Sequence, residues 1–299
     1  MAAPTKKFNI YEEVTNKIIE ALEAGVTPWA KPWASAKHGA LRNAVTNRPY
    51  RGLNTLLLGV ASMVKGYTDP RWLTYKNAVK LGGAVRKGEK GTQVIFWNFL
   101  TVENNASAAT PARDKKIPFI RAYTVFNVQQ CDNLNIPSLV VAPTVQEDNT
   151  LPEAEAIISI ADVVYGGDRP AYMPSLDKIS LPLSSIFKSI NDYYTTAFHE
   201  VVHWTGHKTR LDRDLANRFG SEAYAFEELV AEMGSAFLCS TVAIPLEGMQ
   251  HPEYINSWLQ VLREDNRAIF TAASKAQQAA DFVVKAAGLV QEEDVEESE

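Results

Sequence analysis

The sequence predicts an α+β protein of two domains. Apolar residues recur at helical spacing along much of the chain, and a few shorter runs alternate as strands do. A length of 299 residues suits two domains better than one. Charge divides the chain in the same way. Residues 1–130 hold 19 Lys+Arg and 8 Asp+Glu, a net charge of +11. Residues 131–299 hold 11 Lys+Arg and 27 Asp+Glu, a net charge of −16.

The first domain, assigned to residues 1–135, is predicted to be an α+β module. Glycines close its helical segments, and a polar loop at residues 103–116 separates its two strand-like runs. The expected helices are at 11–25, 50–66 and 72–83. Residues 85–100 are expected to form a basic turn followed by a strand, and another strand is expected at 117–131.

The second domain is assigned to residues 151–287. A proline-containing linker, 136–150, precedes it, and an acidic tail, 288–299, which we expect to be disordered, follows it. A hairpin is expected at 171–182, shortly before the two strongest helical segments. The expected helices are at 152–164, 189–206, 222–240 and 253–286.

Composition excludes several classes of protein. No stretch approaches the roughly 18–20 apolar residues of a membrane helix, so no membrane partner is expected. The first residues lack the apolar core of a secretion signal. The two cysteines, Cys131 and Cys239, lie far apart in sequence, which argues against a disulfide framework. These features favour a reducing, cytoplasmic location.

The segment HEVVH predicts a metal site of the zinc type. His199 and His203 stand at i and i+4, so on a helix both imidazoles face the same side and can bind one ion. Zinc, or another divalent metal, would be the cofactor, because catalytic zinc takes three protein ligands and leaves a position for water. Glu200 is then placed to act as the catalytic base.

The third ligand is open to several candidates. His207 lies beyond Gly206, which is expected to end the helix, and Thr209 stands where a metzincin would have its third histidine. We assign Glu228 as the ligand and Glu232 as the acceptor for a histidine N–H, since acids are unusual on so apolar a helix. The remaining alternatives are Glu227, Asp212 and Asp214.

The basic domain predicts a surface for single-stranded nucleic acid, since cations alternate with aromatic residues. Alternatively, the tryptophans belong to the core and the lysines keep the domain soluble. The candidates for base stacking are Trp29, Trp33, Tyr50, Trp72, Tyr75 and Trp97. The candidates for phosphate contacts are Lys31, Arg51, Lys76, Arg86, Lys87 and Lys90.

The order of motifs resembles the ArdC family of plasmid antirestriction proteins. The motifs are PWAKPW, YRGLN, WLTYKNA and VRKGEKG, then HEVVHWTGH, RLDR and FGSEAYAFEELVAEMGSAFL. The resemblance covers all but the acidic tail. It implies an N-terminal domain that binds single-stranded DNA and a C-terminal zincin-like metallopeptidase fold, a layout similar to Spartan-type proteases. It also implies that His199, Glu200 and His203 form the core of the site, and that the 171–182 hairpin pairs with an extended peptide.

Three functions are consistent with these features. The leading hypothesis is a metal-dependent peptidase recruited to DNA, which protects incoming conjugative DNA from host restriction by acting on a host protein. The alternative is a non-catalytic DNA-binding shield whose metal site is structural or vestigial, so that the basic domain alone protects. Nuclease chemistry is the weakest candidate, because an acidic domain repels phosphate.

Overall fold

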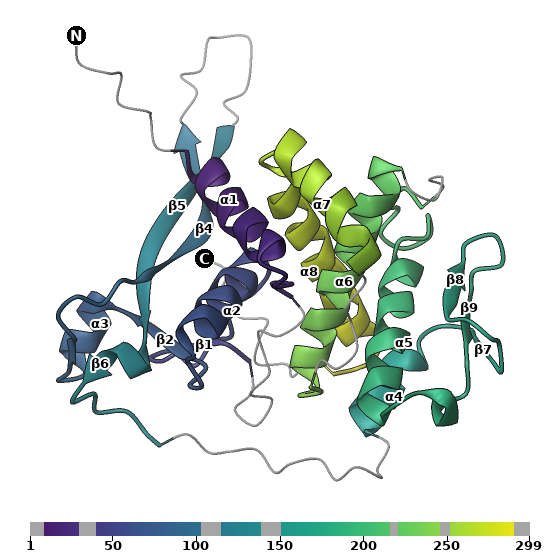
Figure 1. Ribbon diagram of the computed structural model, residues 1–299, viewed down its shortest axis with the longest axis horizontal. Coiled ribbons are helices and arrows are strands. Elements are labelled where there is room, and N and C mark those ends of the chain that lie inside the picture. Colours follow the sequence, from purple (N-terminus) through teal and green to yellow (C-terminus); the bar gives the residue numbers. More distant parts are fainter. Residues whose placement is uncertain are drawn as a thin grey trace, which may run out of the picture. The chain divides into compact units, whose positions relative to one another are not determined.

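In the computed structural model the chain combines helices with β-sheets, which confirms the expected α+β class (Figure 1). The structure describes residues 9–29, 40–102, 115–138, 151–215, 221–245 and 252–289. Contacts divide the chain into two compact units. One unit takes residues 1–41, 49–70 and 138–299, and the other takes 42–48 and 71–137. We call them the helical unit and the sheet unit.

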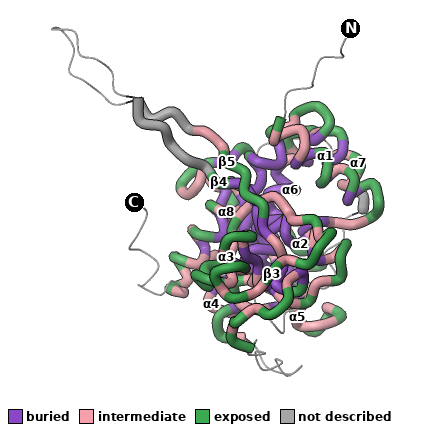
Figure 2. Tube along the Cα trace, turned by 90° about the vertical axis from the view of Figure 1, so that its left-hand side faces the viewer, coloured by how far each residue is buried: buried purple, intermediate pink, exposed green. Residues whose placement is uncertain are grey.

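The helical unit is built around helix α6, whose residues are buried along most of its length (Figure 2). Helix α5 packs against α6 and α8, and α7 also packs against α6. Its helices are α1 (Ile10–Glu23), α2 (Leu53–Lys65), α4 (Pro152–Ile158), α5 (Ile190–Thr205), α6 (Glu222–Thr241), α7 (Pro252–Glu264) and α8 (Ala268–Ala286).

The first two helices of the chain pack against its last two. Helix α1 lies against α7, and α2 contacts α8. Thr15 Oγ1 on α1 donates a hydrogen bond of 2.7 Å to the carbonyl of Asn266, between α7 and α8. The N–H of Gly52, which caps α2, donates to Gln277 Oε1 on α8 at 2.8 Å. The N-terminal helices therefore belong to the same packed body as the C-terminal ones.

A three-stranded sheet lies beside α5 in the helical unit. Its order is β7 (Val163–Tyr165), β9 (Lys178–Leu181) and β8 (Ala171–Met173), with β7 parallel and β8 antiparallel to β9. The turn between β8 and β9 contains Asp177 in the left-handed region, at φ +52°. The short 3-10 turn Ser184–Ile186 follows β9. Since α5 contacts both β8 and β9, the edge strand β8 is held close to the helix that carries HEVVH.

The sheet unit is formed by a four-stranded sheet and one short helix. The long antiparallel hairpin of β4 (Thr92–Val102) and β5 (Lys115–Asn127) dominates it. The strand order is β1 (Arg42–Asn43), β2 (Arg71–Thr74), β5 and β4, and β3 (Ala84–Val85) pairs separately with β6 (Cys131–Asp132). Leu73 on β2, Ala78 on α3 (Tyr75–Lys80) and Val128 in the 3-10 turn Val128–Gln130 form one buried apolar cluster of this unit.

The largest differences from the sequence prediction concern three segments. The helix expected at 152–164 ends at Ile158, because the Val-Val-Tyr run Val163–Tyr165, rich in strand-forming residues, pairs with β9. The helix expected at 253–286 is divided into α7 and α8, since Asp265 Oδ1 accepts the N–H of Arg267 at 2.8 Å and forms a local turn. Residues 71–74, expected partly as helix, pair with β5 as strand β2.

The grouping by contacts cuts across the predicted domain division. It places residues 1–41 and 49–70 with 138–299, whereas the sequence assigns residues 1–135 to one domain. The predicted boundaries at 135 and 151 stay predictions. Much of the expected loop, linker and tail lies outside the described residues, namely 103–114, 139–150 and 290–299. Within the described ranges, no helix combines the length and hydropathy needed to cross a bilayer.

Candidate metal centre

Helix α5 carries both histidines on one face. It begins after Ser189, whose Oγ accepts a hydrogen bond of 3.0 Å from the N–H of Asp192. Its apolar side chains, including Phe198, are buried and fix the rotation of the helix. One turn therefore separates His199 from His203, and their Nε2 atoms lie 3.1 Å apart.

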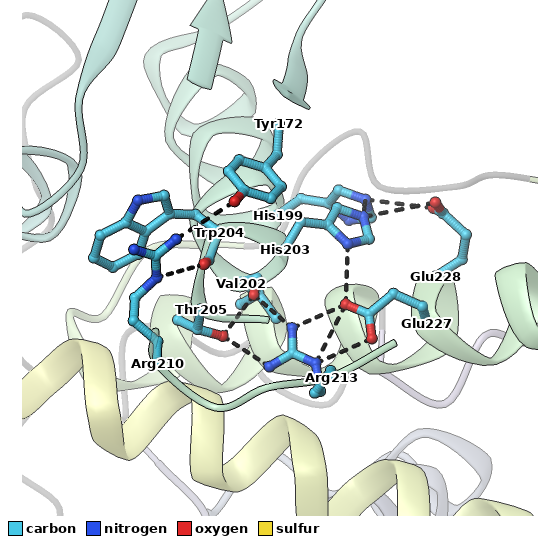
Figure 3. A network of polar contacts seen from close by, with 10 residues as sticks. All are labelled: Tyr172, His199, Val202, His203, Trp204, Thr205, Arg210, Arg213, Glu227 and Glu228. Carbon is cyan, nitrogen blue, oxygen red and sulfur yellow. Dashed lines mark hydrogen bonds and ion pairs between the residues drawn. The ribbon is translucent and has the colours of Figure 1, made fainter. Parts of the chain in front are cut away.

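Helix α6 brings Glu228 to the two histidines. Glu228 Oε2 lies 3.5 Å from His199 Nε2, and Oε1 lies 3.6 Å from His203 Nε2 (Figure 3). Among the described residues, these three form the group whose ligand atoms converge, all within 4.8 Å of one another. The structure thus brings together the three residues that the sequence nominates as ligands.

The spacing of the three ligand atoms fits a divalent ion. Tetrahedral zinc bonds nitrogen and oxygen at roughly 2.0–2.2 Å, so two of its ligand atoms stand about 3.3 Å apart. The two Nε2 atoms lie 3.1 Å apart, and each lies 3.5 or 3.6 Å from one of the two carboxylate oxygens of Glu228, so the separations lie on either side of that value. Two imidazole nitrogens and one carboxylate oxygen also form a donor set typical of catalytic zinc.

The centre is electrostatically suited to a cation. Burial lowers the pKa of His199, but the hydrogen bond with Glu228 and the charges of Glu200 and Glu232 outweigh it and raise the pKa to about 9. Burial raises the pKa of Glu228, but the contacts with His199 and His203 prevail and lower it to about 2. The surplus of buried carboxylate charge attracts positive charge to this point.

A glycine sets the distance between the two ligand-bearing helices. A Cβ atom on Gly234 of α6 would lie 2.8 Å from Cγ2 and 2.9 Å from Cγ1 of Val202 on α5. No ordinary side chain fits at this separation. Gly234 therefore allows α6 to approach α5 closely enough for Glu228 to meet the histidines.

Replacing Gly234 by alanine is expected to destabilise the protein by about 1–3 kcal/mol, as overpacking does. In an unstrained helix the same change stabilises the protein by about 1 kcal/mol, so a loss of stability would indicate the close contact with Val202. Urea unfolding measures the change in the free energy of unfolding. As a control, Gly234→Ala combined with Val202→Ala should cost less than the sum of the two single changes. Additive costs would contradict the contact.

Glu200 faces a cleft of about 510 Å³ that His199, His203 and Glu228 also line. Its Oε2 accepts a hydrogen bond of 2.6 Å from the backbone N–H of Tyr172 on the edge strand β8. Strand β8 is an edge strand that pairs with β9 on one side only. The Tyr172 N–H lies on the opposite, free edge and points toward the cleft. Strand β8 therefore fixes the orientation of the Glu200 carboxylate.

Arg210 anchors the β8–β9 hairpin to the end of α5. Its guanidinium pairs with Asp177 in the hairpin turn. Its Nε donates to the Trp204 carbonyl at 2.7 Å (Figure 3). It also lies 3.8 Å from the centroid of the Trp204 ring. Tyr172 Oη donates to Asp177 at 2.8 Å. The strand that contacts Glu200 is thus anchored to the helix that carries Glu200.

Glu227 holds the outer nitrogen of His203. Glu227 Oε1 lies 3.2 Å from His203 Nδ1, and its carboxylate accepts from Arg213 Nε at 3.0 Å and Nη2 at 2.9 Å. Arg213 is itself buried and donates to Thr205 Oγ1 at 2.8 Å. Burial raises the pKa of Glu227, but its contacts with His203 and Arg213 lower it overall. The role of Arg213 could not be predicted from the sequence, because no local pattern marks a buried arginine.

Glu232, which the sequence nominates for this kind of contact, is buried on α6, and its charge raises the pKa of His199. Its assignment as a hydrogen-bond acceptor stays a prediction.

Glu227→Gln is expected to weaken metal affinity about 10- to 100-fold, because outer carboxylates orient the ligating histidine and raise its basicity. Isothermal titration with Zn²⁺ and Mn²⁺ measures the effect. Glu222→Gln is the matched control, since Glu222 lies in the first turn of the same helix and contacts Gln260. Equal affinities for the two variants would show that Glu227 does not tune the site.

The other candidate ligands lie apart from this group. His207 Nδ1 contacts Thr209 Oγ1 at 2.8 Å and is 3.9 Å from Asp177. Asp214 lines the cleft but does not belong to the convergent group, and Asp212 occupies a left-handed backbone position at φ +48°. Within the described residues, the geometry thus favours Glu228 as the third ligand.

The candidate stacking residues have mixed environments. Trp29 and Trp72 are fully buried, and Trp29 packs edge-on against Trp258 at 5.2 Å. They therefore act as core residues, the alternative considered from the sequence, and offer no face to a base. Tyr50 is partly buried, whereas Tyr75 on α3 is 58% exposed. Trp33, Lys31 and the side chain of Trp97 lie outside the described residues.

The candidate phosphate contacts also divide into two groups. Arg51 belongs to the helical unit and pairs with Asp281, while Arg86 pairs with Glu89 at 2.9 Å and is further bonded to the Gln129 carbonyl. By contrast, Lys76, Lys87 and Lys90 are exposed and form no ion pair with the described residues. The three exposed candidates without an ion pair among the described residues thus lie in the sheet unit.

Comparison with known proteins gives two family matches. Residues 8–126 match the N-terminal domain of the anti-restriction factor ArdC, and residues 152–275 match a zincin-like metallopeptidase family. A protein designated y4eC from Sinorhizobium fredii is 40% identical over 94% of this chain and 93% of its own. A DNA primase TraC from Escherichia coli is 39% identical over 95% of this chain, but the chain spans only 28% of TraC.

Two solved structures also match over the whole of their chains. Both are crystal structures of the antirestriction protein ArdC from plasmid R388, at 39% identity and covering 95% of this chain. The metal-free form gives a TM-score of 0.80 and the Mn(II)-bound form 0.77. The two domain matches, in the order that the motifs predict, agree with this likeness. The chain belongs to the ArdC antirestriction family.

Proposed function

We propose that this protein binds single-stranded DNA through its sheet unit and hydrolyses peptide bonds at the His199–His203–Glu228 centre. In this proposal it protects incoming conjugative DNA from host restriction in the cytoplasm. The observation that carries the enzymatic part is the convergence of three ligand atoms beside Glu200 in an open cleft. Membership of the ArdC family supports the protective role.

The side chains of the cleft suit peptide hydrolysis. Zinc or another divalent ion would act as a Lewis acid and lower the pKa of water at the centre. Glu200 accepts the proton of the attacking water, with its carboxylate held by the Tyr172 N–H. An extended peptide adds to the edge strand β8, which the Arg210–Asp177 pair fixes beside the centre.

Charge supports DNA binding by the sheet unit. Its residues, 42–48 and 71–137, hold 12 Lys+Arg against 4 Asp+Glu, a net of +8, so the rest of the chain carries −13. A polyanion is attracted to the sheet unit, while the unit that carries the metal centre repels it. The same separation disfavours nuclease chemistry at the centre.

Two measurements on the purified whole chain test the proposal. Affinity for a single-stranded oligonucleotide should fall with salt, with a log–log slope of about −0.7 for each phosphate neutralised. A slope of zero would remove the electrostatic binding mode. Cleavage of an unfolded protein substrate should require added Zn²⁺ or Mn²⁺ and stop with chelator. Absence of cleavage with metal and DNA both present would reject the peptidase.

The concentration of cations also favours the shield as a second candidate. The sheet unit holds none of the metal ligands, so binding could protect DNA without catalysis. The Glu200 variant described in the Discussion distinguishes the two.

A further inference from the structure

One face of the β4–β5 hairpin presents aromatic rings to solvent. In the register of the two strands, Phe96 lies opposite Arg121, and Val94 lies opposite Tyr123. Directly opposed residues share a face, so all four point to the same side. Phe96 is 44% and Tyr123 39% exposed, and their rings meet edge to face with centroids 5.4 Å apart.

The exposure of these two rings does not result from incomplete burial of core residues. On the same face, Val94 and Val125 are almost completely buried, at 0% and 2% exposure, so the buried part of this face ends just before the rings. Large rings in solvent cost free energy unless a partner covers them. Phe96 and Tyr123 thus extend the apolar face beyond the core, as a contact surface does.

A cation completes this surface. Arg121 is exposed and forms no ion pair within the described part of the chain, and its guanidinium lies 5.8 Å from the Phe119 ring centroid. Phe119 lies opposite Asn98 and so shares the same face. Rings and an unpaired guanidinium thus stand side by side in a unit with a net charge of +8.

We propose that Phe96, Tyr123 and Arg121 form a base-stacking platform for single-stranded DNA. The proposal rests on the DNA binding proposed above and names where bases are held. Aromatic faces suit bases, and Arg121 suits the adjoining phosphate. Duplex DNA is a poor occupant, because its bases already stack on one another. The positive unit also disfavours a basic protein partner.

The test removes the aromatic faces but keeps apolar bulk. Phe96→Leu/Tyr123→Leu should weaken binding of an oligo-dT probe about tenfold or more, as loss of base stacking does. The matched control, Phe96→Tyr/Tyr123→Phe, keeps both rings and should bind as the original chain does. Circular dichroism and thermal unfolding verify that both variants are folded.

A second probe separates stacking from charge. An abasic oligonucleotide of equal length keeps every phosphate, so the original chain should bind it about tenfold more weakly than oligo-dT. The leucine variant should bind the two probes alike. If it still prefers oligo-dT as strongly as the original chain does, the platform is wrong although DNA binding stands. If the original chain binds neither probe, the proposed DNA binding itself fails.

Discussion

Glu200→Gln is expected to reduce peptide hydrolysis by about 10²- to 10⁴-fold, the usual contribution of a general base. Glutamine keeps the shape of the side chain, and its carbonyl can still accept the Tyr172 N–H that now bonds Glu200 at 2.6 Å. It cannot accept a proton from water. The three ligand atoms are untouched, so metal content and DNA affinity should be unchanged.

The variant also tests whether the proposed protection of DNA depends on catalysis. Transfer of a plasmid that carries restriction sites into a restricting host should measure protection by Glu200→Gln beside the original chain. Loss of protection at equal metal content and DNA affinity would assign the effect to catalysis. Full protection would assign it to DNA binding and reject the peptidase as the protective activity. Undiminished cleavage would exclude Glu200 as the base.

His199→Ala is expected to abolish stabilisation of the fold by metal. At a free metal concentration about 100 times the Kd, a bound ion contributes about 2.7 kcal/mol, or roughly 5–10 °C in Tm for a unit of this size. Without His199, two of the three convergent ligand atoms remain. Thermal unfolding with and without Zn²⁺ or Mn²⁺ measures the difference within each variant.

His207→Ala is the matched control for this measurement. His207 follows His203 by four residues but contacts Thr209 and does not belong to the convergent group. Its variant should keep the full metal-dependent rise in Tm. An equal loss of the rise in both variants would contradict the ligand assignment.

The core of the site could be predicted because it is local. The i, i+4 spacing alone places His199 and His203 on one face of a helix, and Glu200 follows from the same segment. Glu228 could be nominated because a carboxylate is unusual among buried apolar neighbours. The partner of His203 could not be predicted, because it depends on how α6 is rotated and how closely Gly234 lets it approach.

In the fold too, features set by the local sequence could be predicted, whereas features set by tertiary contacts could not. Helical periodicity continues across residues 265–267, where a side-chain turn interrupts the helix. Residues 163–165, two valines and a tyrosine, form a strand because β9 is beside them. The sequence does not show whether an aromatic residue that lies among cations is buried or exposed. Trp72 lies in the core, whereas Phe96 and Tyr123, within apolar runs, are exposed.

The path of the chain restricts how the two proposed activities can be tested separately. It passes from the helical unit to the sheet unit and back twice, at residues 41–49 and 70–138. A fragment of residues 1–150 would keep α1 and α2 but lack α7 and α8, exposing side chains such as Ile18 and Leu56 that are now fully buried. Each would cost about 1.5–3 kcal/mol in water. Such a fragment should aggregate, so single substitutions in the intact chain are the sounder way to separate DNA binding from catalysis.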